Sequence, residues 1–178
     1  MLFGCEVFEF KMLTAIHNLV QCDFMDFFMT AISAIGNGGA VWIVAALIML
    51  ATKKYRNIGF KLAIGLIAGL IFGNIILKNL VARPRPCWIF EDIDMLIAVP
   101  QDFSFPSGHT LASFTSAFIL LDADRRMGIP AIIIAALMAF SRMYLFVHFP
   151  TDILGGIILS GIIFVMIKKF MKKKNALV

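Results

Sequence analysis

The segment Phe103–Phe114 reads FSFPSGHTLASF and joins a polar turn to an apolar run. Ser107 follows Pro106 and is a good N-cap residue for a helix that begins at Gly108. The following positions are apolar and predict a short helix over residues 107–121. The titratable side chain of His109 therefore lies in the first turn of an otherwise apolar helix.

Composition assigns the chain to the membrane proteins. Of its 178 residues, 61% are hydrophobic and 15% charged, whereas soluble domains average roughly 45–50% and 25%. The formal net charge of +5 does not indicate nucleic-acid binding, because the basic residues form short clusters between apolar runs. We therefore expect an integral membrane protein with no nucleic-acid partner.

The apolar runs predict an all-α fold in one domain, residues 1–178. A helix needs about 20 apolar residues to cross the hydrocarbon core. Residues 5–20 carry polar side chains on one side and predict an amphipathic interfacial helix. Residues 172–178 form a basic tail. The bundle over residues 22–171 is expected to hold six transmembrane helices, at 22–36, 38–52, 57–81, 107–121, 128–147 and 151–170.

Basic residues predict the orientation of these spans. With six spans, all but four of the 16 basic residues fall on the side of both termini. Basic loops stay in the cytoplasm. We therefore expect a multi-pass protein of the cell membrane with cytoplasmic N- and C-termini. The four exceptions, on the outer side, are Lys78, Arg83, Arg85 and Arg142.

Three stretches meet at that outer face: KNLVARPRP (Lys78–Pro86), the segment quoted first, and SRMYLFVHFPTD (Ser141–Asp152). Lys78, Arg85 and Arg142 offer fixed positive charges that suit phosphate oxygens. The N–H groups at the helix start, with Ser107 and Gly108, add an anion site. These residues together predict a binding site for a phosphoryl group.

Two imidazoles and a carboxylate predict the chemistry. His148 and Asp152 are four residues apart across Pro150, so the carboxylate can orient the ring and leave one nitrogen as a nucleophile. His109 suits an acid that protonates the departing oxygen. No cluster of Cys, His and Asp residues has the spacing of a metal site, so we expect neither metal nor cofactor.

Each of these residues has a structural explanation when taken alone. Lysine and arginine near helix ends anchor spans at the interface, and Ser107 with Gly108 is an ordinary helix start. Their joint occurrence on one side favours a site, because charges at the membrane cost several kcal/mol unless paired or hydrated.

The three motifs, in order and at full spacing, resemble the type 2 phosphatidic acid phosphatase (PAP2) superfamily. The resemblance implies that His148 becomes a phosphohistidine, that Asp152 orients it, and that His109 protonates the leaving group and activates water. It implies that Lys78, Arg85 and Arg142 hold the phosphate with help from Ser107 and Gly108. Arg83, which lacks the family spacing from Lys78, is a candidate for a supporting or headgroup contact.

The resemblance favours undecaprenyl diphosphate as the substrate, as in small bacterial members of the family. Phosphatidylglycerophosphate or phosphatidate is the alternative. An anion transporter or an inactive scaffold would use the same cations, but a transporter should carry polar residues across the bilayer, and the spans have almost none. The loop over residues 87–105, with its acidic residues, is expected to roof the site.

Overall fold

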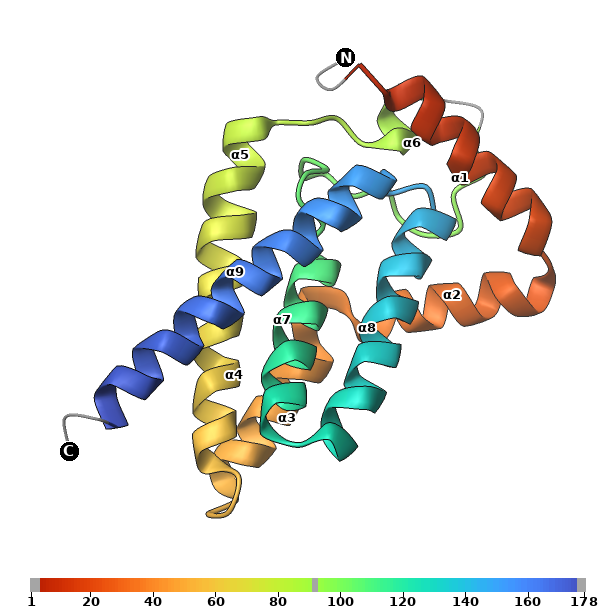
Figure 1. The fold of residues 1–178 in the computed structure, drawn as a ribbon. Helices are drawn as coiled ribbons and strands as arrows, with labels where there is room; N and C mark the ends of the chain where they lie inside the picture. The colour runs from red at the N-terminus through yellow and green to blue at the C-terminus, as the bar shows by residue number, and fades with distance from the viewer. Residues whose placement is uncertain (1–3, 91–92, 176–178) are drawn as a thin grey trace.

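The computed structural model describes residues 4–90 and 93–175, with side chains up to residue 171. Helices make up this part of the chain and it contains no strand, which confirms the all-α class (Figure 1). The elements in chain order are α1 (Glu6–Val20), α2 (Asp23–Ile35), η1 (Asn37–Gly39), α3 (Ala40–Ala51), α4 (Arg56–Ala68), η2 (Gly69–Leu77), α5 (Lys78–Val81), α6 (Pro86–Ile89), α7 (Gly108–Ala123), α8 (Arg125–Tyr144) and α9 (Pro150–Asn175).

Helix α7 is the central helix of the bundle, and α4, α8 and α9 pack around it (Figure 1). Its side chains are buried on several sides, including Leu111 and Ala117. Small residues allow this close packing. Gly65 and Gly73 face Thr115 and Leu111 of α7.

Three helical segments in the described residues are long and apolar enough to cross a membrane: Arg56–Ile89, Arg125–Tyr144 and Pro150–Met171. Helices α2 and α3 reach that length only together, across a bend of 44°. Helix α7, with 16 residues, is short, as expected. The helices lie where they were predicted, but the count of six spans is not confirmed: the described residues hold three candidate spans, or up to four if α2 and α3 form one.

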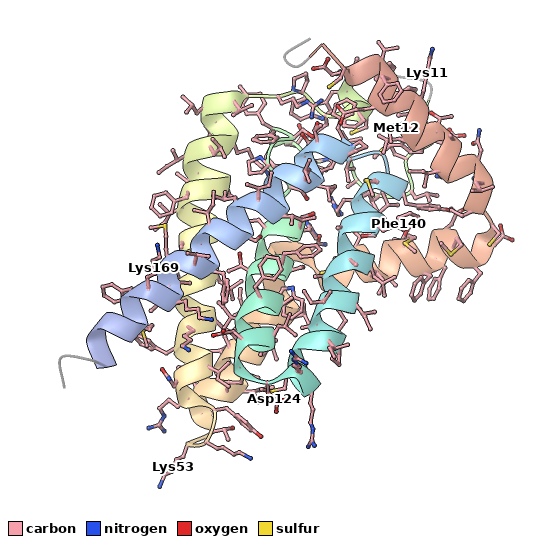
Figure 2. The ribbon with its side chains drawn as sticks, viewed as in Figure 1. Lys11, Met12, Lys53, Asp124, Phe140 and Lys169 are labelled. Carbon is pink, nitrogen blue, oxygen red and sulfur yellow. The ribbon has the colours of Figure 1, made fainter. Side chains whose placement is uncertain are left out.

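Helix α1 lies at the same end of the bundle as α5 and α6 (Figure 1). Its polar residues Glu6 and Glu9 are buried against the protein, whereas Phe8 and Leu19 are exposed. Figure 2 shows Lys11 at the opposite end from Lys53 and Asp124. Helix α1 thus lies away from the basic turn at Lys53, and the side of the membrane on which it lies stays a prediction. Helix α2 turns across the bundle and meets α3 at a bend of 44°.

A π-helical turn, η2, interrupts the long span just before Lys78. Such turns widen a helix and occur frequently at functional sites. Here the helix continues into α5, and Lys78 is turned inward and buried. The helix ends at Ala82, whose φ of 47° is left-handed.

Some predictions fall outside the described residues. These are Glu91 and Asp92 of the acidic loop, residues 176–178 of the basic tail, and the side chains of Lys172, Lys173 and Lys174.

The packing of α8 on α7 generates the first prediction. A Cβ added to Gly128 would lie 2.2 Å from the Cα of Leu121, and backbone cannot move aside cheaply. We expect Gly128→Ala to destabilise the fold by about 2–3 kcal/mol, as overpacking does. The measurement is the unfolding midpoint of the purified protein in detergent.

Gly161→Ala is the matched control, because nothing lies within 4 Å of a Cβ at that helical position. It should leave the midpoint unchanged or raise it, since alanine is the better helix former. Equal midpoints for the two variants would contradict the tight α7–α8 contact.

Candidate active site

The three stretches predicted to meet do so at one end of the bundle. They line a cavity of about 780 Å³, a volume typical of small-molecule sites. Predicted site residues that line it are Lys78, Arg85, Gly108, His109, Arg142 and His148. The two imidazoles therefore border one cavity together with all three cations of the predicted phosphate site.

Local backbone geometry presents His148 to this cavity. Helix α8 ends at Tyr144, and Phe146 takes a left-handed φ of 55°. The N–H groups of Val147 and His148 then donate to the carbonyl of Arg142, which reverses the chain. Pro150 begins α9, as proline favours the first helical position. His148 thus lies in a short loop between two helices, held by hydrogen bonds from its own N–H and that of Val147.

The three cations are buried and held in place. Lys78 is 6%, Arg85 2% and Arg142 4% exposed. Arg142 donates to the hydroxyl of Ser33 on α2. Arg85 donates from Nη1 to the carbonyl of Val147 at 2.7 Å. Positive charges confined at such low exposure favour an anionic guest.

Asp102 binds two of these cations. Its Oδ1 lies 2.7 Å from Nη2 of Arg85, and its Oδ2 accepts from Nζ of Lys78. Burial raises the pKa of Asp102, but Lys78 and Arg85 outweigh it and lower the pKa to about 2. The carboxylate therefore stays charged at ordinary pH. Because its side chain is 58% exposed, it can move away from the cations.

The ring of His148 has a defined tautomer. Its Nε2 lies 3.1 Å from Nη1 of Arg85. A guanidinium only donates, so Nε2 must carry the lone pair and Nδ1 the proton. Burial, followed by Arg85, Arg142 and Lys78, holds the pKa of His148 well below its usual range. The ring is thus neutral, with a lone pair beside the cations.

Asp152 reaches His148 largely through Ser104. The Oδ2 of Asp152 lies 3.6 Å from Nδ1 of His148, beyond hydrogen-bond distance. The Ser104 hydroxyl donates to Oδ2 and lies 3.3 Å from Nδ1, where it can accept the ring proton. The N–H of Phe149 also donates to Oδ2, at 2.8 Å. Asp152 itself is fully buried behind the ring and does not line the cavity.

His109 lies across the cavity, with Nε2 3.2 Å from Oδ1 of Asn37. Ser107 caps α7 through Thr110 and is not among the described residues that line the cavity. The structure shows its role at the helix start, and its expected contact with phosphate stays a prediction. Gly108 does line the cavity, and a Cβ there would lie 2.8 Å from Oδ1 of Asn74.

Arg83 is fully buried and is not among the described residues that line the cavity. Its Nη1 donates to Oδ1 of Asp152 at 2.6 Å, and its Nη2 donates to Glu9 at 2.6 Å. Of the two contacts proposed for Arg83, the structure therefore favours the supporting one and not the headgroup contact.

The sequence analysis missed several residues around the site: Asn37, Asn74 and Ser104, together with the cation contacts of Asp102. Asn74 carried a signal, since it is a polar residue inside an apolar span, one turn before Lys78. Ser104 lies just ahead of the PSGH motif, and nothing in its local pattern distinguishes it from an ordinary loop serine.

Known proteins are similar to this chain in sequence and in fold. The family model of the PAP2 superfamily matches residues 58–176. An undecaprenyl-diphosphatase of Sulfolobus acidocaldarius is 35% identical over 122 residues, which cover 68% of this chain and 59% of that protein. The undecaprenyl-diphosphatase BcrC of Bacillus subtilis is 28% identical over 156 residues, or 87% of this chain and 80% of that protein.

A solved structure extends the similarity to nearly the whole chain. The transmembrane PAP2-type phosphatidylglycerolphosphate phosphatase of Bacillus subtilis superposes with a TM-score of 0.76 at 27% identity. The match covers 96% of this chain and 88% of that one. The resemblance seen in the motifs is thus confirmed, and the chain belongs to the PAP2 superfamily, within its membrane-embedded branch of lipid phosphatases.

Proposed function

We propose that this protein hydrolyses a lipid phosphate through a phosphohistidine at His148, without a metal ion, and that its substrate is undecaprenyl diphosphate. The observation that carries the proposal is one cavity bordered by two imidazoles and three buried cations. The names of the relatives support the choice of substrate.

In the first step, Lys78, Arg85 and Arg142 bind the phosphoryl oxygens and spread their charge. The lone pair on Nε2 of His148 forms a bond to phosphorus, and the bond from phosphorus to the leaving oxygen breaks. His109 donates a proton to that oxygen. In the second step, neutral His109 removes a proton from water, which attacks phosphorus and releases phosphate from His148.

The carboxylate network supports the cationic ring formed in this step. The proton on Nδ1 of His148 can bind Ser104, whose hydroxyl donates to Asp152. A negative charge behind the ring stabilises the phosphorylated imidazole, as in catalytic triads. Substrate phosphate must displace Asp102 from Lys78 and Arg85, so this carboxylate competes with phosphate for the cations.

The apolar part of the cavity supports a lipid substrate. Beyond the cations it extends between α3 on one side and α4 and η2 on the other, lined by Ile43, Leu47, Leu66, Ile67 and Leu70. Leu47 and Ile67 are more than half exposed, so this part opens to the side of the bundle. A lipid tail can lie there while its phosphate binds the cations.

We further propose that the site faces outward at the headgroup level. Lys53, and Asp124 next to Arg125 and Arg126 in the chain, lie at the end of the bundle away from Lys11 and α1 (Figure 2), and basic residues favour the cytoplasm. The C-terminal end of α9 is then cytoplasmic, whereas α1 lies on the outer side with the site.

The test of the function is phosphate release by the purified protein in detergent with EDTA. The substrates are undecaprenyl diphosphate, phosphatidylglycerophosphate and phosphatidate, compared by kcat/KM. We expect undecaprenyl diphosphate to be hydrolysed fastest. A higher value for phosphatidylglycerophosphate would favour the alternative, which is supported by a Bacillus subtilis relative named phosphatidylglycerophosphatase B. If no phosphate is released from any of the three lipids, the proposed phosphatase activity is contradicted.

His148→Ala should abolish turnover, because it removes the imidazole whose Nε2 lies 3.1 Å from Nη1 of Arg85 and which is the proposed nucleophile. Loss of an enzyme's nucleophile lowers kcat by several orders of magnitude, so we expect a fall on the order of 10⁴-fold or more. The measurement is the initial rate at saturating substrate.

His17→Ala is the control for that variant. His17 lies on α1 against the carbonyl of Tyr144 and does not line the cavity. It should keep the wild-type rate. Substantial turnover by the His148 variant would show that the nucleophile lies elsewhere.

Asp102→Asn should tighten inhibition by free phosphate. The substitution removes the negative charge that competes for Lys78 and Arg85. Since an ion pair with an exposed carboxylate contributes up to about 1 kcal/mol, we expect the inhibition constant to fall by up to about fivefold. It is measured from initial rates at increasing phosphate.

Asp94→Asn, an exposed carboxylate on the same loop, should leave the inhibition constant unchanged. A weaker phosphate affinity in the Asp102 variant would instead mean that Asp102 positions the two cations for the substrate.

A further inference from the structure

Helix α1 supplies a buried carboxylate to the region behind the catalytic ring. Glu9 is 3% exposed, although α1 is the first helix of the chain and lies outside the stretch matched to the PAP2 family. Its Oε1 accepts from the N–H of Thr151 at 2.8 Å and from the hydroxyl of Thr151 at 2.7 Å. Glu9 is therefore bonded to the first turn of α9, one residue before Asp152.

The guanidinium of Arg83 joins Glu9 to Asp152. Nη2 donates to Oε2 of Glu9, and Nη1 donates to Oδ1 of Asp152, each at 2.6 Å. Nη1 also donates to the hydroxyl of Thr151 at 2.7 Å, and the ring of Phe149 lies 4.2 Å from the guanidinium carbon. The position of Arg83 is thus determined from several directions, and its charge is shared between two carboxylates.

The charge balance around His148 depends on this sharing. Behind the ring lie Arg83, Asp152, Glu9 and Glu6, the last with Oε1 3.9 Å from Nη2 of Arg83. On the cavity side lie Lys78, Arg85, Arg142, Asp102 and His109. If Arg83 had Asp152 as its main partner, it would neutralise the carboxylate that faces the ring.

We propose that Glu9 is a positioning residue for the reaction, which draws part of the charge of Arg83 away from Asp152 and so leaves Asp152 negative enough to support His148. This inference rests on the proposed function. It makes α1 part of the catalytic apparatus and not only a membrane anchor.

Removal of the Glu9 charge should make the imidazolium form of His148 less favourable. With glutamine at position 9, Arg83 would act on Asp152 with its full charge. Less negative potential would then reach His148, so its imidazolium form would become less favourable. The neutral ring would persist to lower pH, but it would be a weaker nucleophile with a less stabilised phosphorylated form.

The experiment compares wild type and Glu9→Gln in detergent, with undecaprenyl diphosphate as substrate. We expect kcat to fall about tenfold, at the lower end of what loss of an outer partner of a functional imidazole causes. KM should stay unchanged, because Glu9 contacts none of the three phosphate-binding cations. The acid limb of the kcat–pH profile should move to lower pH.

A purely structural role for Glu9 predicts a different pattern. Partial unfolding lowers the active fraction, and hence kcat, but does not move the pH profile. Lys11→Gln is the matched control, because it removes a charge from an exposed position of the same helix. It should keep the wild-type kcat and pH profile.

Glu9→Asp keeps the inference testable if Glu9→Gln does not fold. Aspartate keeps the charge, but it is one methylene shorter and cannot reach both Thr151 and Arg83 as glutamate does. Its kcat and pH profile should lie between those of wild type and the neutral variant. A wild-type profile in every folded Glu9 variant would overturn the inference alone, whereas an inactive wild type would overturn the proposed function with it.

Discussion

A buried guanidinium must be neutralised, and in this protein that requirement links the helices at one end of the bundle. Arg83 has no exposed surface and pairs with carboxylates from α1 and α9. Breaking a buried ion pair from one side is strongly destabilising because the partner charge stays behind. The N-terminal helix, the turn after α5 and the start of α9 are therefore held in one arrangement, which sets the position of Asp152.

The site divides its charges between two sides of a single ring. Cations face the cavity, where a phosphoryl group would bind, and carboxylates lie behind His148. Ser104 connects the two sides because its hydroxyl can accept from the ring and donate to Asp152 at the same time. Burial and the cations keep the ring neutral, and its Nε2 lone pair lies against Arg85.

Much of the fold and the site could be predicted from the sequence, because their signals are local. Apolar runs predicted the helices, and the three motifs predicted Lys78, Arg85, His109, Arg142 and His148, which the structure brings to one cavity. The number of membrane spans could not be determined from the apolar runs. Whether α2 crosses separately depends on a bend of 44° at η1, and short apolar helices do not reveal such a bend.

The sequence by itself determined the membrane class and the helix positions and indicated the candidate site residues, since hydrophobicity and motif spacing are properties of neighbouring residues. Only the tertiary structure decided that Glu9 and Arg83 stand behind Asp152, that Ser104 lies between Asp152 and His148, and that α1 belongs to the site end. These contacts join residues up to 142 positions apart. Packing and the neutralisation of buried charge determine which residues form these contacts, and no local sequence pattern indicates them.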